Sequence, residues 1–208
     1  MKINLLDIPV LYINLDSDKS EKIRIESMLN DLGFKDVRRV PGVKSSHKIS
    51  GVAMAHKRAL EEGLKLGSPF ILLENDVIAD NFKEEITIPN DADAYYLGLS
   101  VWGLKDGTGV RSISVEKYDK ETYRLYNMLG GHAILHINPE YVKFLIKSAD
   151  FFIKIKTNQD KGRAESMKYW NIYGNVDSIF AQGGRLYPYT SFSLPGPKSF
   201  PANRVYLT

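Results

Sequence analysis

The sequence predicts an α/β fold with a mostly parallel central sheet flanked by helices. Between residues 8 and 75, short apolar runs rich in β-branched residues alternate with segments whose apolar residues recur every three or four positions. This order of strand, helix, strand, helix and strand is typical of right-handed β-α-β units, whose sheets are covered on both faces. Ligands bind such sheets where the strands end, so polar residues there are candidates for a site.

The first strand and helix are predicted between residues 8 and 33. The run from Ile8 to Ile13 is apolar and leads into Asn14-Leu15-Asp16, which would lie at the carboxyl end of the strand. Ser20 can cap the helix that follows. Gly33 is expected to end that helix, because glycine is common at helix C-termini. The apolar face of this helix is expected to consist of Ile25, Met28, Leu29 and Leu32.

Another strand, helix and strand are predicted between residues 34 and 73. The first strand covers residues 34–40, and the helix begins near Ser50 and ends at Gly67. The run from Pro69 to Leu73 is apolar throughout and is predicted to be a central parallel strand. One face of the helix is expected to be buried, formed by Val52, His56, Ala59, Leu60 and Leu64.

The second half of the chain has a weaker pattern. Strands are predicted over residues 93–99 and 133–137, with an exposed glycine-rich loop at 103–109 between them. Asn138 is expected to cap a helix with Pro139 in its first turn. The apolar stripe of that helix would be Tyr141, Phe144, Leu145 and Ala149.

Two further segments are polar or rich in proline. Residues 154–168 are polar and basic, so we expect either a mobile loop near the site, which orders over a bound substrate as a lid, or a solvated excursion of the chain. Residues 194–201 contain three prolines and one glycine and are predicted to be extended.

Composition indicates one soluble domain covering residues 1–208. With 43% hydrophobic residues the chain can build one continuous core, and 28 Lys and Arg against 25 Asp and Glu give no broad field for binding nucleic acid. The lack of cysteine excludes disulfides and thiolate metal sites and favours the cytoplasm. No apolar run has the length of a signal peptide or a membrane span, so a soluble protein is expected.

The strongest chemical motif is Glu74-Asn75-Asp76, which directly follows the predicted strand at 69–73. Two carboxylates at a strand end reach an open crevice, where a hard divalent cation can bridge them to phosphate oxygens. Glu74 and Asp76 are therefore candidate metal ligands. The alternative is an acidic turn after a strand, and this motif alone does not choose between the two.

Other candidates lie near predicted strand and helix ends. Gly131 could allow close approach of the backbone to a sugar, and His132 is a candidate third metal ligand. His56 is either a core histidine or a group that donates to a diphosphate or orients a carboxylate. Arg58 could reach a phosphate, although exposed helix positions are usually solvated.

Four further segments follow one another along the chain: Tyr12-Ile13-Asn14-Leu15-Asp16, Gly51-Val52-Ala53-Met54-Ala55-His56, Leu72-Leu73-Glu74-Asn75-Asp76-Val77 and Asn175-Val176-Asp177-Ser178-Ile179. In this order they resemble glycosyltransferase family 25, which includes lipopolysaccharide and collagen galactosyltransferases. The chain departs from the family pattern at three positions: Asn75 replaces the usual Asp, Ala55 stands where Ser precedes the His, and Ser17 stands where a basic residue is expected.

The resemblance implies a GT-A fold and an inverting transfer from a nucleotide-diphosphate sugar, with Mn²⁺ or Mg²⁺ as cofactor. A uridine-diphosphate hexose or pentose would be the donor, and a glycan or protein hydroxyl the acceptor. Asn14 and Asp16 would contact the nucleotide, with Asn75 beside them, and Asp177 would be the catalytic base. A turn-and-cap role is the alternative for Asn14 and Asp16, and a helix cap is the alternative for Asp177.

Two other functions remain open on the sequence. The departures at Asn75 and Ala55 allow a catalytically silent module that binds nucleotide sugars or glycans. The basic segment at 154–168 allows an enzyme that acts on modified bases of nucleic acid, whose binding would weaken steeply with salt.

Overall fold

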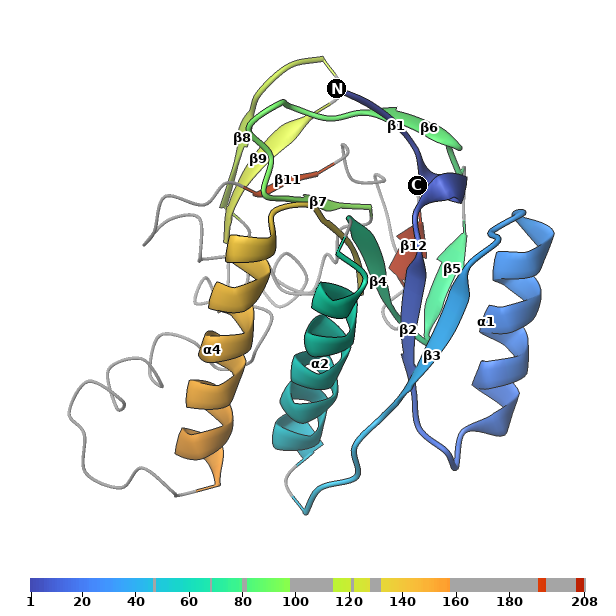
Figure 1. Cartoon of the computed structure of the whole chain (residues 1–208), viewed down its shortest axis with the longest axis vertical. Helices are drawn as coiled ribbons and strands as arrows, with labels where there is room; N and C mark the ends of the chain where they lie inside the picture. Colours follow the sequence, from blue (N-terminus) through green and yellow to red (C-terminus); the bar gives the residue numbers. More distant parts are fainter. Residues whose placement is uncertain are drawn as a thin grey trace.

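The structure is a computed structural model. It describes residues 1–46, 48–67, 69–79, 82–97, 114–120, 122–127, 132–157, 191–193 and 205–207. Its centre is an eight-stranded sheet in the order β3-β2-β4-β10-β7-β11-β9-β8, with helices packed against it (Figure 1). The predicted α/β class is confirmed in this coarse form, as a sheet flanked by helices.

Three parallel strands form one side of the sheet, as predicted for the first half of the chain. In the parallel register, Val10 pairs with Val37 on one side and with Ile71 on the other. Aligned parallel strands bring their carboxyl ends to one edge, so Asn14 and Glu74 end up near each other. The strands are β2 (Val10–Asn14), β3 (Val37–Pro41) and β4 (Phe70–Glu74).

The prediction of a mostly parallel sheet is wrong, because the sheet is mixed. Strand β10 (Ala133–His136) lies between β4 and β7 (Ala94–Tyr96) and is antiparallel to both. A short apolar run has the same alternation of side chains in either direction, so the sequence does not reveal strand direction. The other strands of this sheet are β8 (Ser114–Lys117), β9 (Tyr123–Asn127) and β11 (Ser191–Ser193).

Two small sheets accompany the large one within the described residues. Strands β1 and β6 pair antiparallel, and β5 and β12 pair parallel. A 3-10 helix, η1 (Leu5–Asp7), follows β1. The strands are β1 (Lys2–Asn4), β5 (Val77–Ala79), β6 (Glu85–Thr87) and β12 (Val205–Leu207).

The helices that cover the sheet have caps that follow from local sequence. Helix α1 (Lys19–Asp31) is capped by Asp18, whose carboxylate accepts from the N–H of Glu21, rather than by Ser20 as predicted. It ends before Gly33, whose φ of 91° suits glycine, as predicted.

The other two long helices of the described chain are close to their predicted bounds. Helix α2 (Lys48–Lys65) begins before Ser50, and helix α4 (Pro139–Lys156) is capped by Asn138, whose side chain accepts from the N–H of Glu140 at 2.9 Å. Because α4 continues to Lys156, it includes the first residues of the predicted lid.

Side chains alternate between the two faces of the sheet, so each face has a core of its own. On α2, Val52 is more exposed than predicted, while its partners His56, Ala59 and Leu60 are buried. One core contains Leu11, Leu72, Tyr96 and Ile134 with residues of α2 and α4. The other contains Tyr12, Leu73, Tyr95 and Leu135 with Ile25 and Leu29 of α1.

Some of the predicted segments fall outside the described residues, namely the loop at 103–109, most of the lid and the tail at 194–201. Within the described ranges, none of the helices has the length and apolar character needed to cross a lipid bilayer.

Candidate functional site

A cleft of about 700 Å³ lies where β2 and β4 end. Its lining comes from the ends of these two strands, from residues 42–45 after β3, and from α2 as far as His56. Asn14, Glu74, Asn75 and Asp76 all line it. This is the edge of a parallel sheet at which ligands are expected.

Glu74, the last residue of β4, lies between two histidines. Nε2 of His56 on α2 is 2.8 Å from Oε1 of Glu74, and Nδ1 of His132, just before β10, is 2.7 Å from Oε2. The N–H of Glu74 also donates to the carbonyl of His132 at 2.8 Å, which extends the pairing of β4 with β10. His56 is buried, as predicted. Its ring contacts the carboxylate of Glu74, which agrees with the alternative that this histidine orients a carboxylate.

Asp76 lies in the two-residue turn between β4 and β5. Its Oδ1 is buried without a hydrogen bond from any described residue and is 4.0 Å from Nδ1 of His132. One potential ligand atom from each of Glu74, Asp76 and His132 lies within 4.8 Å of the other two. The structure therefore brings the three predicted metal ligands together.

The two acids of this cluster have pKa values shifted in opposite directions. Burial raises the pKa of Asp76, and the negative charge of Glu74 raises it further. Burial also favours the protonated form of Glu74, but hydrogen bonds from His132 and His56 outweigh it and hold the pKa of Glu74 well below its usual range. A cation placed between the acids would favour the ionised form of Asp76.

The side chain of Asn75 belongs to a network of hydrogen bonds with Asn14 and Asp18. Its Nδ2 donates to Oδ1 of Asn14 at 2.8 Å and to Oδ2 of Asp18 at 3.3 Å. Nδ2 of Asn14 in turn donates to the carbonyls of Leu15 and Asp18. Asn14 is buried, so much of its hydrogen-bonding capacity serves to hold the strand ends together.

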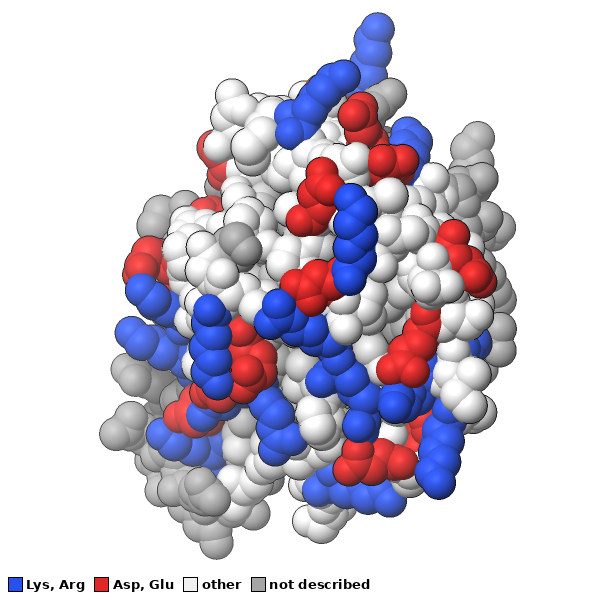
Figure 2. Space-filling view, turned by 45° about the vertical axis from the view of Figure 1, so that its right-hand side comes forward, with Lys and Arg blue, Asp and Glu red and all other residues white. Residues whose placement is uncertain are grey.

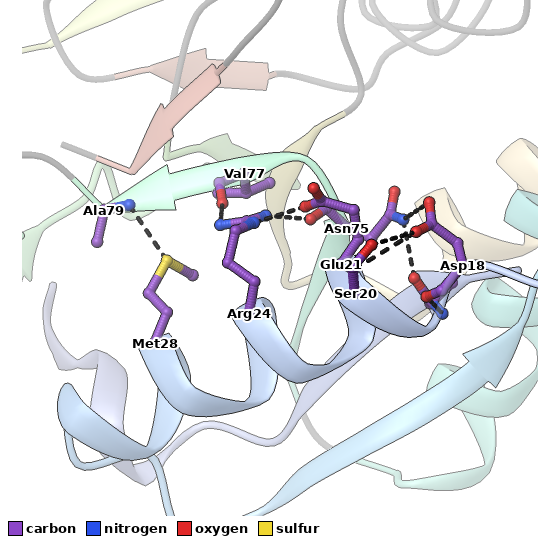
Figure 3. A network of polar contacts seen from close by, with 9 residues as sticks. Asp18, Ser20, Glu21, Arg24, Met28, Asn75, Val77 and Ala79 are labelled. Carbon is purple, nitrogen blue, oxygen red and sulfur yellow. Dashed lines mark hydrogen bonds and ion pairs between the residues drawn. The ribbon is translucent and has the colours of Figure 1, made fainter.

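Arg24 of α1 reaches the same turn (Figure 3). Its Nη1 donates to the carbonyl of Val77 at 2.9 Å, and its Nη2 donates to the carbonyl of Asn75. Its Nε donates to Glu21 at 2.5 Å. The turn at residues 75–76 is thus held by side chains from α1 and by the end of β2.

Two of the predicted site residues are not gathered at this cluster, and two others lie outside the described residues. Asp16 is exposed and pairs with Arg39, and Arg58 is exposed and donates to the carbonyl of Pro41 at 3.1 Å. Gly131 and Asp177 lie outside the described residues.

Other residues of this region carry no role in the sequence-based prediction. Asp18, Lys44 and Lys48 also line the cleft, and Arg24 holds the turn. Asp18 could have been found as a helix cap, because aspartate caps helices about as well as serine does. The two lysines have little signal of their own, because exposed lysines are usually only solvated.

The charged side chains do not form a large field of one sign on the face shown in Figure 2. Basic and acidic residues are interspersed there. On α1, Lys22 pairs with Glu26 and Arg24 pairs with Glu21. This face gives no support to binding of nucleic acid, which needs a basic surface.

Comparison with known proteins gives no family. No protein-family model and no curated protein matches the sequence. Among solved structures, the chain is similar to the nucleoside-diphosphate-sugar pyrophosphorylase from Vibrio cholerae RC9, at 11% sequence identity and a TM-score of 0.48. That match covers 91% of this chain and 73% of the pyrophosphorylase.

Proposed function

We propose that the chain is a metal-dependent inverting glycosyltransferase, which moves a hexose or pentose from a nucleotide-diphosphate sugar to a hydroxyl of a glycan or protein. The observation that carries the proposal is the cluster of Glu74, Asp76 and His132 beside a cleft of about 700 Å³ at the strand ends. The sequence resemblance to glycosyltransferase family 25 supports it, because three of the matching segments contribute to this cleft.

The residues fit a hard divalent cation such as Mn²⁺ or Mg²⁺. Oδ1 of Asp76 is buried and has no hydrogen bond within the described part of the chain, so a cation would supply the partner that it lacks there. Carboxylate oxygens with one imidazole suit Mn²⁺. Glu74, Asp76 and His132 would hold the ion, which when bound would neutralise charge on the leaving diphosphate.

The chain itself would bind the donor and move one proton. Asn14, Asn75 and His56 line the cleft and would form the wall against which the nucleotide sugar lies. By resemblance, Asp177 would take the proton of the acceptor hydroxyl as its oxygen bonds to the anomeric carbon and the bond to the diphosphate breaks.

Calorimetric titration with Mn²⁺ and then with a panel of uridine-diphosphate sugars tests the proposal. We expect wild type to bind Mn²⁺ and to bind one donor more tightly in its presence. Asp76→Ala should weaken Mn²⁺ binding by at least ~10-fold while the protein stays folded. Glu61→Ala, which removes an exposed carboxylate of α2, is the matched control and should bind normally.

Equal Mn²⁺ and donor binding by wild type and Asp76→Ala would refute the proposed site. Failure of wild type to bind Mn²⁺ or any of the donors would refute the proposed function.

A silent sugar-nucleotide-binding module is the second candidate, and one observation favours it. Both carboxylate oxygens of Glu74 already receive hydrogen bonds from histidines, which is an arrangement that needs no metal. Slow hydrolysis of the donor in the presence of Mn²⁺ that disappears in Asp76→Asn would identify an enzyme. Donor binding without Mn²⁺ and without hydrolysis would identify the silent module.

A further inference from the structure

We infer that Arg24 is a positioning residue, which holds the turn between β4 and β5 so that the carboxylate of Asp76 faces the cleft. The inference rests on the proposed function for what Asp76 binds. The contacts of Arg24 themselves belong to the fold and do not depend on that function.

The two main-chain acceptors of Arg24 lie on either side of Asp76. Nη2 donates to the carbonyl of Asn75, and Nη1 donates to the carbonyl of Val77 at 2.9 Å, as Figure 3 shows. The first bond holds the peptide group that precedes Asp76, and the second holds the peptide group that follows Val77, so together they anchor the backbone on both sides of the pair Asp76-Val77. The direction of the Asp76 side chain depends on how this short stretch of backbone is held.

The guanidinium is itself held in place from α1. Its Nε donates to Oε2 of Glu21 at 2.5 Å, one turn earlier on the same helix. Three nitrogens of one planar group are thus engaged at once, which lysine cannot reproduce with a single nitrogen. One helical turn further on, the N–H of Ala79 contacts Sδ of Met28 at 3.3 Å, so α1 follows β5 beyond the turn.

The turn needs such support because it interrupts the strands. β4 ends at Glu74 and β5 begins at Val77, and β5 pairs with β12 rather than with the large sheet. The Asn75 carbonyl therefore has its partner in Arg24 rather than in a ladder of the large sheet. Without this partner the turn could adopt other conformations, in which Asp76 would leave the position close to Glu74 and His132.

The test compares Mn²⁺ affinity among folded variants. We expect Arg24→Met to weaken Mn²⁺ binding ~10- to 100-fold, as loss of a group that orients a ligand typically does. Arg24→Lys keeps the charge and can reach one carbonyl at a time, so its affinity should lie between Arg24→Met and wild type. Arg38→Met removes another arginine, which lies on β3 and pairs with Asp36, and this variant should bind Mn²⁺ as wild type does.

Stability is measured separately by urea denaturation, and the titrations use conditions in which each variant is fully folded. A purely structural Arg24 would lower stability without changing the Mn²⁺ affinity of the folded protein. If Arg24→Met does not fold, the Mn²⁺ affinity of Arg24→Lys is compared with that of wild type instead.

Three outcomes would overturn the inference. Wild-type Mn²⁺ affinity in Arg24→Met, with binding lost in Asp76→Ala, would refute the role of Arg24 and leave the proposed function intact. Wild-type affinity in Arg24→Lys would show that the double contact is not needed. Absence of Mn²⁺ binding in wild type would refute both the inference and the proposed function.

Discussion

At the scale of single residues, the contacts of Asn75 account for an amide at a position where the resembling family usually has aspartate. Its Nδ2 donates to Oδ1 of Asn14 and to Oδ2 of Asp18. An aspartate at this position would have no donor and would bring a second negative charge to Asp18. The amide therefore fits its surroundings here, so the departure at Asn75 need not indicate a decayed motif.

Replacement of Asn75 by aspartate should destabilise the protein. Asn75→Asp removes two donated hydrogen bonds and adds a charge beside Asp18, and we expect a loss of about 1–3 kcal/mol in the free energy of unfolding at pH 7. Urea denaturation measures this loss. Adding Asp18→Asn should recover part of it, because the new amide can cap α1 and can donate to the introduced carboxylate in the double variant.

Asn90→Asp is the control for this substitution. Asn90 is exposed, and its side-chain oxygen accepts from the amino group of Met1, a role that aspartate can keep. Similar effects of Asn75→Asp and Asn90→Asp on stability would contradict the account of the network.

The sequence predicted part of the site and missed the rest for a physical reason. Glu74 and Asp76 are recognisable because carboxylates follow directly on an apolar strand. The contact of Arg24 with the turn joins residues about fifty positions apart, and it depends on how α1 packs beside β5. Periodicity shows which face of a helix is buried, but not which main-chain carbonyls its polar residues reach.

At the scale of elements, helix α2 approaches β4 closely at Gly63. A Cβ built on Gly63 would lie 2.2 Å from Cζ of Phe70, the first residue of β4. Glycine in a helix usually weakens it by about 1 kcal/mol relative to alanine. Here the space that a Cβ would need is filled by the buried ring of Phe70. The steric cost of a side chain at this position is therefore expected to exceed the gain in helix propensity.

We therefore expect Gly63→Ala to destabilise the protein by about 1–3 kcal/mol, in spite of the better propensity of alanine. Chemical denaturation measures the change, and Phe70→Leu should reduce it in the double variant by removing the ring. Glu62→Ala, at an exposed position next to Gly63, is the control and should change stability little. A stabilising effect of Gly63→Ala would show that Phe70 moves aside without penalty.

The elements also show what the sequence could determine. Between residues 8 and 75, the predicted bounds of the helices and parallel strands lie within a few positions of the observed ones, because caps and apolar periodicity act locally. The prediction of a mostly parallel sheet was wrong, because β10 is antiparallel to both of its neighbours and strand direction depends on how the whole chain is connected. The single domain over residues 1–208 stays a prediction.

At the scale of the whole molecule, His136 couples stability to pH at the far end of β4 from the cleft. It pairs in register with Phe70, whose ring stacks on the imidazole at a centroid distance of 5.0 Å. His136 is 1% exposed, neither ring nitrogen has a hydrogen-bond partner among the described residues, and the side chain lines a cavity of about 240 Å³. Burial lowers the pKa of His136 to about 3, and the nearby charge of His56 contributes to the lowering.

This shift determines the pH range in which His136 affects stability. The unfolded chain binds a proton at His136 near pH 6.5, whereas the folded protein does so only near pH 3. The stability contributed by the buried neutral ring is therefore present above pH 6.5 and is lost as the pH falls toward 3. Glu74, with its lowered pKa, adds a loss of the same sign, but only below the normal pKa of a glutamate.

The two groups can therefore be separated by measuring unfolding between pH 7 and pH 5. If His136 alone titrates in that window, wild type should lose about 2 kcal/mol through it, because each unit of pKa difference is worth about 1.4 kcal/mol. His136→Leu should remove most of this slope in urea denaturation. Val142→Ala, which truncates an apolar side chain of the same cavity, should lower stability at both pH values and leave the slope unchanged. An unchanged slope in His136→Leu would mean that the pKa of His136 is the same in the folded and the unfolded protein, and the protonated buried ring would then need a partner that the described residues do not supply.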